Sequence, residues 1–86
     1  MSILGIPKWV VMDVRPFEDY RLELLFASGE KREYDARPLL LKKIYEPLKI
    51  LNFFMKAHVD GDSVVWNDDI DIAPEHLYEC SKNIVN

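Results

Sequence analysis

The feature that most constrains the fold is a regular alternation of side chains over residues 20–27, followed at once by Ser28-Gly29. A period of two residues is typical of a β-strand with one buried face. The face expected to be buried carries Tyr20, Leu22, Leu24 and Phe26. Because glycine readily adopts the positive φ of a tight hairpin turn, we expect residues 30–35 to return as an antiparallel strand.

The rest of the chain predicts a preceding strand, a second hairpin and short helices. The expected elements are a strand over residues 9–15, a helical turn over 37–41, a helix over 47–53, a hairpin over 55–66, a strand over 70–72 and a helix that begins at Pro74. The charged residues over 30–35 suit the edge of a sheet. This order differs from the alternation of a parallel sheet, so we predict an α+β fold. Its small, mainly antiparallel sheet is built from a three-stranded meander and a second hairpin, with two short helices.

The length of the chain, 86 residues, leaves room for one domain. We assign residues 9–86 to this domain and treat residues 1–8 as an N-terminal arm, which Gly5 and Pro7 interrupt. The arm lacks the basic start and the apolar length of a signal or membrane segment. The single cysteine, Cys80, provides no disulfide framework. A cytoplasmic location without membrane contact is therefore expected.

Negative charge is concentrated in the C-terminal half. The net charge is −4, and residues 44–86 hold eight Asp or Glu against three Lys or Arg. Such a surface attracts basic proteins and repels nucleic acid. The predicted partner-binding residues are Asp60, Asp62, Asp68, Asp69, Asp71, Glu75, Glu79 and, as an aromatic contact, Trp66. The competing interpretation is a solvated face that only keeps the domain soluble.

A smaller group of basic residues supports an alternative. Lys31, Arg32, Lys42 and Lys43 are accompanied by tyrosines, a combination that binds nucleic acid in many proteins. No helix-turn-helix pattern or RNA-binding motif occurs with them, and the acidic net charge opposes phosphate binding. A solvated edge strand and helix are therefore the competing interpretation of this basic edge.

The sequence contains only weak signals for a metal site or a catalytic site. His76 and Cys80 are spaced to share one helical face, and His58 is a third potential ligand, but structural zinc usually needs four. Cys80 is expected to face the core, where a thiol stays protonated and inert. Asp60-Gly61-Asp62 begins like a calcium loop, but apolar residues occupy the ligand and turn positions that follow. We therefore predict no metal site, no cofactor and no catalytic residue.

One combination of residues extends over most of the chain. It comprises Leu22-x-Leu24-x-Phe26, Gly29-Glu30, Tyr34-Asp35, Pro38-Leu39-Leu40, Leu48, Trp66, Asp71 and Pro74-Glu75-x-Leu77-Tyr78. With these residues the chain resembles the bacterial domain of unknown function 2442 family, over about residues 9–80. The stretch from Trp66 to Tyr78 is the most specific part. Residues 67–70 read Asn-Asp-Asp-Ile where the family commonly has a glycine, so a different local turn is expected.

The resemblance implies a small α+β domain without established catalysis. Some similar proteins have been proposed as the antitoxin side of toxin–antitoxin pairs, and some carry a C-terminal helix-turn-helix, which these 86 residues do not include. Together with the acidic half, this favours a non-enzymatic protein-binding module, the antitoxin-like partner of a small basic toxin-like protein. The alternative is a transcriptional regulator that contacts nucleic acid through the basic edge. Self-association as a homodimer stays open.

Overall fold

The computed structural model describes residues 6–84. Two antiparallel sheets, of four and three strands, combine with short helices in a mixed α+β fold that is mostly sheet. The predicted fold class is therefore confirmed, although the meander and the second hairpin belong to separate sheets. Residues 1–5 of the expected N-terminal arm lie outside the described residues. Lys8, which we assigned to the arm, already contacts the domain, because its ammonium nitrogen lies 5.5 Å from the centre of the Tyr78 ring.

The four-stranded sheet contains the predicted meander. Its strands are β1 (Val11–Pro16), β2 (Arg21–Phe26), β3 (Lys31–Asp35) and β7 (Lys82–Asn83), in that order. The alternation predicted for β2 is confirmed, since Leu22, Leu24 and Phe26 are all buried. The prediction that the third strand forms an edge is wrong in part. β7 pairs with β3 through Arg32 and Glu33, so residues near the C-terminal end of the chain cover this edge.

The turns that bound β2 follow local rules. Gly29 has a φ of +92° after β2, as expected for the hairpin glycine. Before β2, Tyr20 was predicted to begin the strand, but it lies in the preceding turn with a φ of 69°. Its amide donates to the carbonyl of Phe17 at 3.0 Å, and the Phe17 amide donates to the carbonyl of Arg21 at 2.9 Å. These bonds close a tight loop, which removes Tyr20 from the regular strand.

A helical segment follows β3. It consists of two 3₁₀ helices, η1 (Arg37–Leu41) and η2 (Lys43–Lys49), and one turn of α-helix, α1 (Leu51–Phe54). The helical turn predicted over 37–41 is confirmed as η1. The helix predicted over 47–53 is divided, because Pro47 lies inside η2 and Ile50 is extended, with φ −82° and ψ 112°. The extended residue ends one helix and serves as the N-cap of the next.

The second sheet is a three-stranded meander that leads into the last helix. β4 (His58–Asp60) and β5 (Ser63–Asn67) form the predicted hairpin around Gly61, which has a φ of +68°. β6 (Ile70–Ile72) pairs with β5, and α2 (Pro74–Cys80) begins at the predicted proline. Local sequence patterns thus located the hairpin and the start of α2, whereas the pairing of β6 with β5 makes this sheet one strand larger than predicted.

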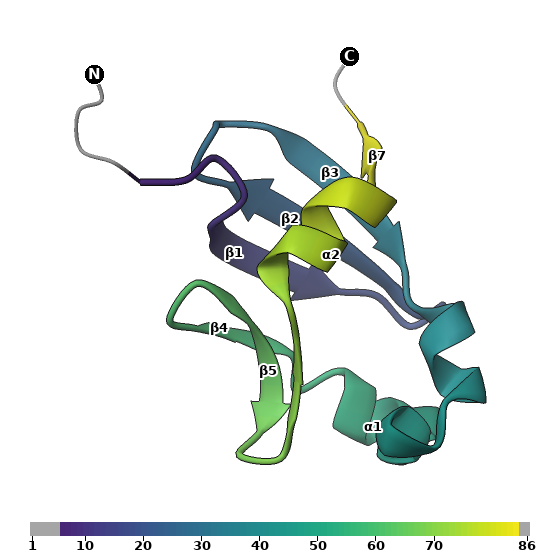
Figure 1. The fold of residues 1–86 in the computed structure, drawn as a ribbon. Coiled ribbons are helices and arrows are strands. Elements are labelled where there is room, and N and C mark those ends of the chain that lie inside the picture. The colour runs from purple at the N-terminus through teal and green to yellow at the C-terminus, as the bar shows by residue number, and fades with distance from the viewer. Residues whose placement is uncertain (1–5, 85–86) are drawn as a thin grey trace.

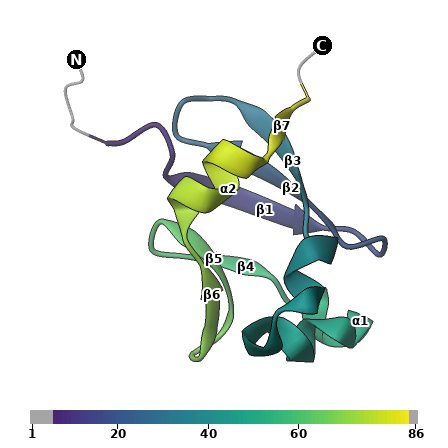
Figure 2. The ribbon, with the colours of Figure 1, turned by 45° about the vertical axis from the view of Figure 1, so that its right-hand side comes forward.

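A single cluster of buried residues joins the two sheets and the helices. Its largest fully buried side chains are Phe26, Phe54, Leu22, Leu24, Leu48, Leu77, Val11 and Val64. Figures 1 and 2 show α2 lying across the four-stranded sheet, with the three-stranded sheet and the helical segment together at the other end of the molecule. The Val11 amide donates to the Asp62 carbonyl at 3.1 Å and so connects the sheets directly. Within residues 6–84, no helix is both long and apolar enough to cross a membrane.

Candidate protein-interaction surfaces

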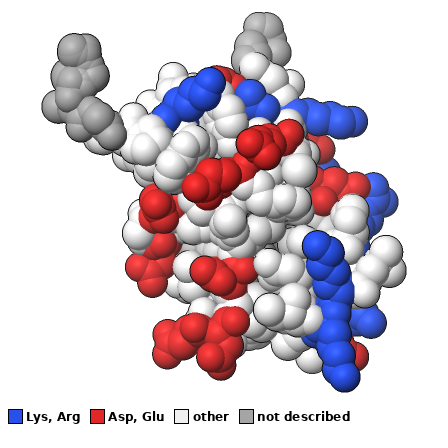
Figure 3. All heavy atoms as spheres, viewed as in Figure 1, with Lys and Arg blue, Asp and Glu red and all other residues white. Residues whose placement is uncertain are grey.

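Seven carboxylates form what we call the acidic face. Its members, all exposed, are Asp60, Asp62, Asp68, Asp69, Asp71, Glu75 and Glu79. Figure 3 shows acidic side chains gathered over the second sheet and α2, while basic side chains lie along the top and the right-hand side of the same view. None of the seven forms an ion pair with another residue in 6–84. The structure thus brings together all the predicted acidic residues and leaves their charges open to solvent or to a partner.

The backbone explains why these side chains point outward. In β6, Ile70 and Ile72 are buried, so Asp71 between them faces solvent. In α2, Leu77 is fully buried, and Glu75 and Glu79 lie on the exposed side of the helix at a spacing of one turn. The acidic face is therefore the outer side of the same elements whose inner side forms the core.

Trp66 does not belong to this surface. Its side chain is only 3% exposed, and its Nε1–H donates to the Phe54 carbonyl at 2.9 Å. The two rings also pack, with their centres 6.1 Å apart. The expectation that Trp66 contacts a partner is wrong, because the tertiary fold uses this side chain to attach β5 to α1.

Arg32, predicted as part of the basic edge, is occupied by contacts within the domain. Its guanidinium donates to the carbonyls of Tyr78 at 3.1 Å and Ser81 at 3.2 Å, and Nη2 lies 2.7 Å from Glu30 Oε1. The same group lies over the Tyr78 ring at 4.2 Å from its centre. Arg32 therefore fastens the end of α2 to β3 and is not available to a nucleic-acid phosphate.

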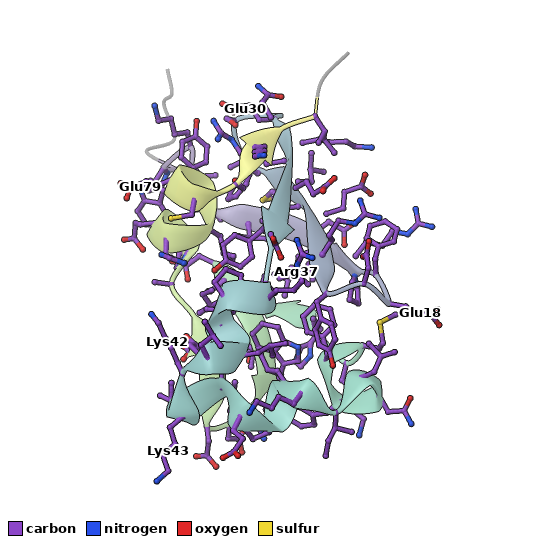
Figure 4. The ribbon with its side chains drawn as sticks, turned by 90° about the vertical axis from the view of Figure 1, so that its right-hand side faces the viewer. Glu18, Glu30, Arg37, Lys42, Lys43 and Glu79 are labelled. Carbon is purple, nitrogen blue, oxygen red and sulfur yellow. The ribbon has the colours of Figure 1, made fainter. Side chains whose placement is uncertain are left out.

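The other basic residues of the predicted edge are separated. Lys31 lies beside Glu30 at one end of β3, whereas Lys42 and Lys43 follow η1 beyond its other end. Figure 4 shows Glu30 near one end of the molecule and Lys42 and Lys43 near the opposite end. The five residues of β3 alone extend over about 13 Å. The sequence cluster therefore does not form one continuous basic surface.

Cys80 is exposed, contrary to the expectation that it faces the core. α2 ends at Cys80, and the extended Ser81 that follows is buried, so of these two residues, both expected on the inner face, only Ser81 lies there. Cys80 Sγ lies 3.6 Å from His76 Nδ1, and His76 Nε2 lies 2.9 Å from the Tyr34 hydroxyl. Burial raises the pKa of Tyr34 to about 12, so the protonated hydroxyl is suited to donate to Nε2. The same hydroxyl can accept from Nε2–H, so these contacts fit either tautomer of His76.

The potential metal ligands of the sequence, His58, His76 and Cys80, do not form one group in the described part of the chain. Over residues 6–84, no three His, Cys, Asp or Glu side chains are grouped closely enough to hold a metal ion. His58 lies on β4, with its Nδ1 3.0 Å from the Lys56 carbonyl, away from the pair on α2. The three residues weighed as zinc ligands are therefore not brought together.

A second surface, which sequence reasoning missed, is an open groove of about 860 Å³. One wall comes from η2 and the residue after it, and the other from the turn between β5 and β6. The lining residues are Lys43, Ile44, Glu46, Pro47, Lys49, Ile50, Asn67, Asp69 and Ile70. Ile44 is 65% exposed, Ile50 is 66% exposed, and nearby Leu41 is 90% exposed. The available signal was the placement of single aliphatic residues directly after lysines, at Lys43-Ile44 and Lys49-Ile50.

A known protein family matches most of the chain. A family model described as "Protein of unknown function (DUF2442)" matches residues 11–83, from the start of β1 to the end of β7. The chain belongs to the DUF2442 family. No curated protein and no solved structure gives a significant match. The DUF2442 description assigns no activity, so any function must be argued from the surfaces.

The predicted departure from the DUF2442 pattern lies in the turn between β5 and β6. Asn67 Oδ1 accepts hydrogen bonds from the amides of Asp69 at 2.8 Å and Ile70 at 2.9 Å. The asparagine side chain thus orders the turn through the backbone amides that follow it. The consequence is a turn that carries two exposed carboxylates, Asp68 and Asp69, at the edge of the groove.

Proposed function

We propose that this DUF2442 protein is a non-enzymatic protein-binding module that recognises a small basic protein, as the antitoxin-like member of a pair. The observation that carries the proposal is the acidic face, whose seven exposed carboxylates form no ion pair within residues 6–84. Like charges held on one side repel one another, and a basic surface relieves this repulsion. Complementary charge also speeds the encounter of two proteins and excludes wrong partners.

Nucleic-acid regulation is less well supported by the same structure. Arg32 is held by α2 and Glu30, and Lys31 lies at the start of β3, away from Lys42 and Lys43. Phosphate binding needs several cations on one surface, because its free energy comes from the release of counterions. The remaining lysines provide too small a cluster to overcome the net charge of −4.

The partner search starts with the product of the adjacent gene. The two proteins are co-expressed, purified through a tag on the DUF2442 protein and analysed by native mass spectrometry. We expect a stable complex whose affinity falls as salt is raised, because exposed charges are screened. Repeated recovery of the free protein alone, with this and other basic candidates, contradicts the proposal.

A pair of variants tests whether the acidic face makes the contact. Glu75→Gln with Glu79→Gln removes two charges from the exposed side of α2, and we expect slower association and weaker binding. Glu18→Gln with Glu23→Gln removes the same charge elsewhere and serves as the control, since Figure 4 shows Glu18 and Glu79 on opposite sides. If both variants weaken the complex equally, binding depends on net charge alone and the assignment to this face fails.

A further inference from the structure

The groove has walls of opposite charge around an apolar centre. The η2 wall carries Lys43 and Lys49, with Glu46 as its single acid, and Lys42 precedes it. The wall from the β5–β6 turn carries Asp69, with Asp68 beside it, and no cation. Figure 3 shows this separation as basic side chains at the lower right and acidic ones at the lower left, with uncharged surface between. The centre is apolar and consists of Ile44, Pro47, Ile50 and the edge of Ile70.

A second copy of this chain fits such a surface. In a two-fold symmetric interface both chains use the same patch. One wall of the groove in the first chain therefore contacts the opposite wall of the groove in the second chain. An axis through the apolar centre would set each basic wall against the mate's acidic wall and pack the exposed isoleucines together. We propose that the groove is the interface of an isologous homodimer. This proposal goes beyond the recognition of a basic protein: the dimer contact would use Asp68 and Asp69 and would leave the other five carboxylates of the acidic face for such a partner.

Other occupants satisfy only part of the groove. An acidic peptide or an anionic lipid surface would complement Lys43 and Lys49 but would be repelled by Asp68 and Asp69. A basic segment would complement Asp68 and Asp69 but would be repelled by Lys43 and Lys49. In a copy related by a two-fold axis, the acidic wall faces the lysines of the first chain and the basic wall faces its aspartates. Both walls of both chains are then paired with opposite charge.

The exposed aliphatic side chains give the interface its apolar area. Ile44 and Ile50 are 65% and 66% exposed, and both line the groove together with Pro47 and Ile70. An exposed apolar strip with polar rims is typical of a protein–protein contact. A standard interface covers about 800 Å² on each partner. The residues that line the groove supply only part of that area, so the surface around its rims must also take part in the interface.

The first test is the mass of the purified full chain in solution. Sedimentation velocity and light scattering are measured from micromolar to near-millimolar concentrations. We expect a species of twice the 10.1 kDa chain mass at the highest concentrations. A mass of one chain at every concentration overturns the proposal, and it leaves the recognition of a basic partner untouched because no partner is present.

Apolar variants then locate the interface. Ile44→Asp places a charge at the apolar centre, and Ile50→Asp does so at the N-cap of α1, where aspartate is a favourable residue. The second variant should therefore stay folded, which circular dichroism verifies. We expect either change to weaken the dimer by about 100-fold or more, since each buries two unpaired charges across the two-fold axis. A dimer that persists in both folded variants uses another surface and overturns the proposal.

Charge reversal tests the symmetry itself. Lys43→Glu with Lys49→Glu makes both walls acidic, and Asp68→Lys with Asp69→Lys makes both walls basic. Each variant alone should be monomeric, and an equimolar mixture should form a heterodimer, because every contact is again between opposite charges. Lys31→Glu with Lys82→Glu, two reversals outside the groove, is the control and should stay dimeric. Failure of the mixture to associate rules out the two-fold arrangement.

Discussion

Replacing Arg32 by alanine tests the structural role that the fold gives to a residue from the predicted basic edge. The guanidinium donates two hydrogen bonds to the carbonyls of Tyr78 and Ser81 and stacks on the Tyr78 ring. These carbonyls lie at the C-terminal end of α2, where backbone acceptors lack helical partners and positive charge is favourable. The substitution therefore removes the main polar connection between α2 and β3.

The size of the effect follows from these contacts. Hydrogen bonds from a charged donor contribute about 1.5 kcal/mol or more each when they are partly buried, and the Arg32 side chain is only 19% exposed. Stacking on the tyrosine adds about 0.5–1 kcal/mol. Because neighbouring contacts are not additive, we expect the free energy of unfolding to fall by about 2–3 kcal/mol. With a urea dependence of about 1–1.5 kcal/mol per M for a small domain, the midpoint falls by about 2 M.

Urea unfolding followed by circular dichroism measures this change. Arg32→Lys should lie between the wild type and Arg32→Ala, since lysine keeps the charge but lacks the planar fork that reaches two carbonyls. Lys31→Ala, at the exposed neighbour, is the control and should change stability by no more than about 0.5 kcal/mol. The contacts to α2 do not stabilise the domain if the free energy of unfolding of Arg32→Ala lies within about 0.5 kcal/mol of the wild-type value, or if it is no lower than that of Lys31→Ala.

Three further predictions concern single side chains. The hydrogen bond from the Tyr78 hydroxyl, followed by that from Arg32, lowers the pKa of Glu30 from its ordinary value of 4.5. Its ionised form therefore stabilises the fold above pH 4.5, and the stability difference between wild type and Glu30→Gln should shrink as urea titrations are taken to lower pH; a difference that grows on acidification would contradict this sign. Trp66→Phe removes the indole donor from the Phe54 carbonyl, which keeps the Ala57 amide at 3.2 Å, and replaces a buried ring with a smaller one. It should cost about 2 kcal/mol in the same assay, whereas an unchanged midpoint would show that the bond at 2.9 Å contributes nothing. Cys80 is exposed, so one thiol should react with a colorimetric disulfide reagent in the native protein at neutral pH, and reaction only after unfolding would place the side chain in the core.

The surfaces of this protein depend on contacts between residues far apart in the chain. Arg32 looks like part of a basic cluster because its chain neighbours are charged, but its partners lie 46 and 49 residues further on. Trp66 looks available to a protein partner because polar and acidic residues follow it in the chain. The fold, however, buries it with its indole N–H bonded to the Phe54 carbonyl. The acidic face was predictable in its membership, because most of its residues occupy turns and the polar positions of alternating or helical patterns. The groove was not, since its two walls are joined only by folding.

The sequence by itself determined the elements whose signals lie within a few neighbouring residues. The alternation of β2, the turns at Gly29 and Gly61 and the start of α2 at Pro74 depend on local backbone preferences, and the structure has them where they were predicted. Only the tertiary structure decided which faces were covered. It added β7 to the edge of β3, ended α2 before Ser81 and left Ile44 exposed. The physical reason is that burial is a property of the whole core, which no local pattern of side chains specifies.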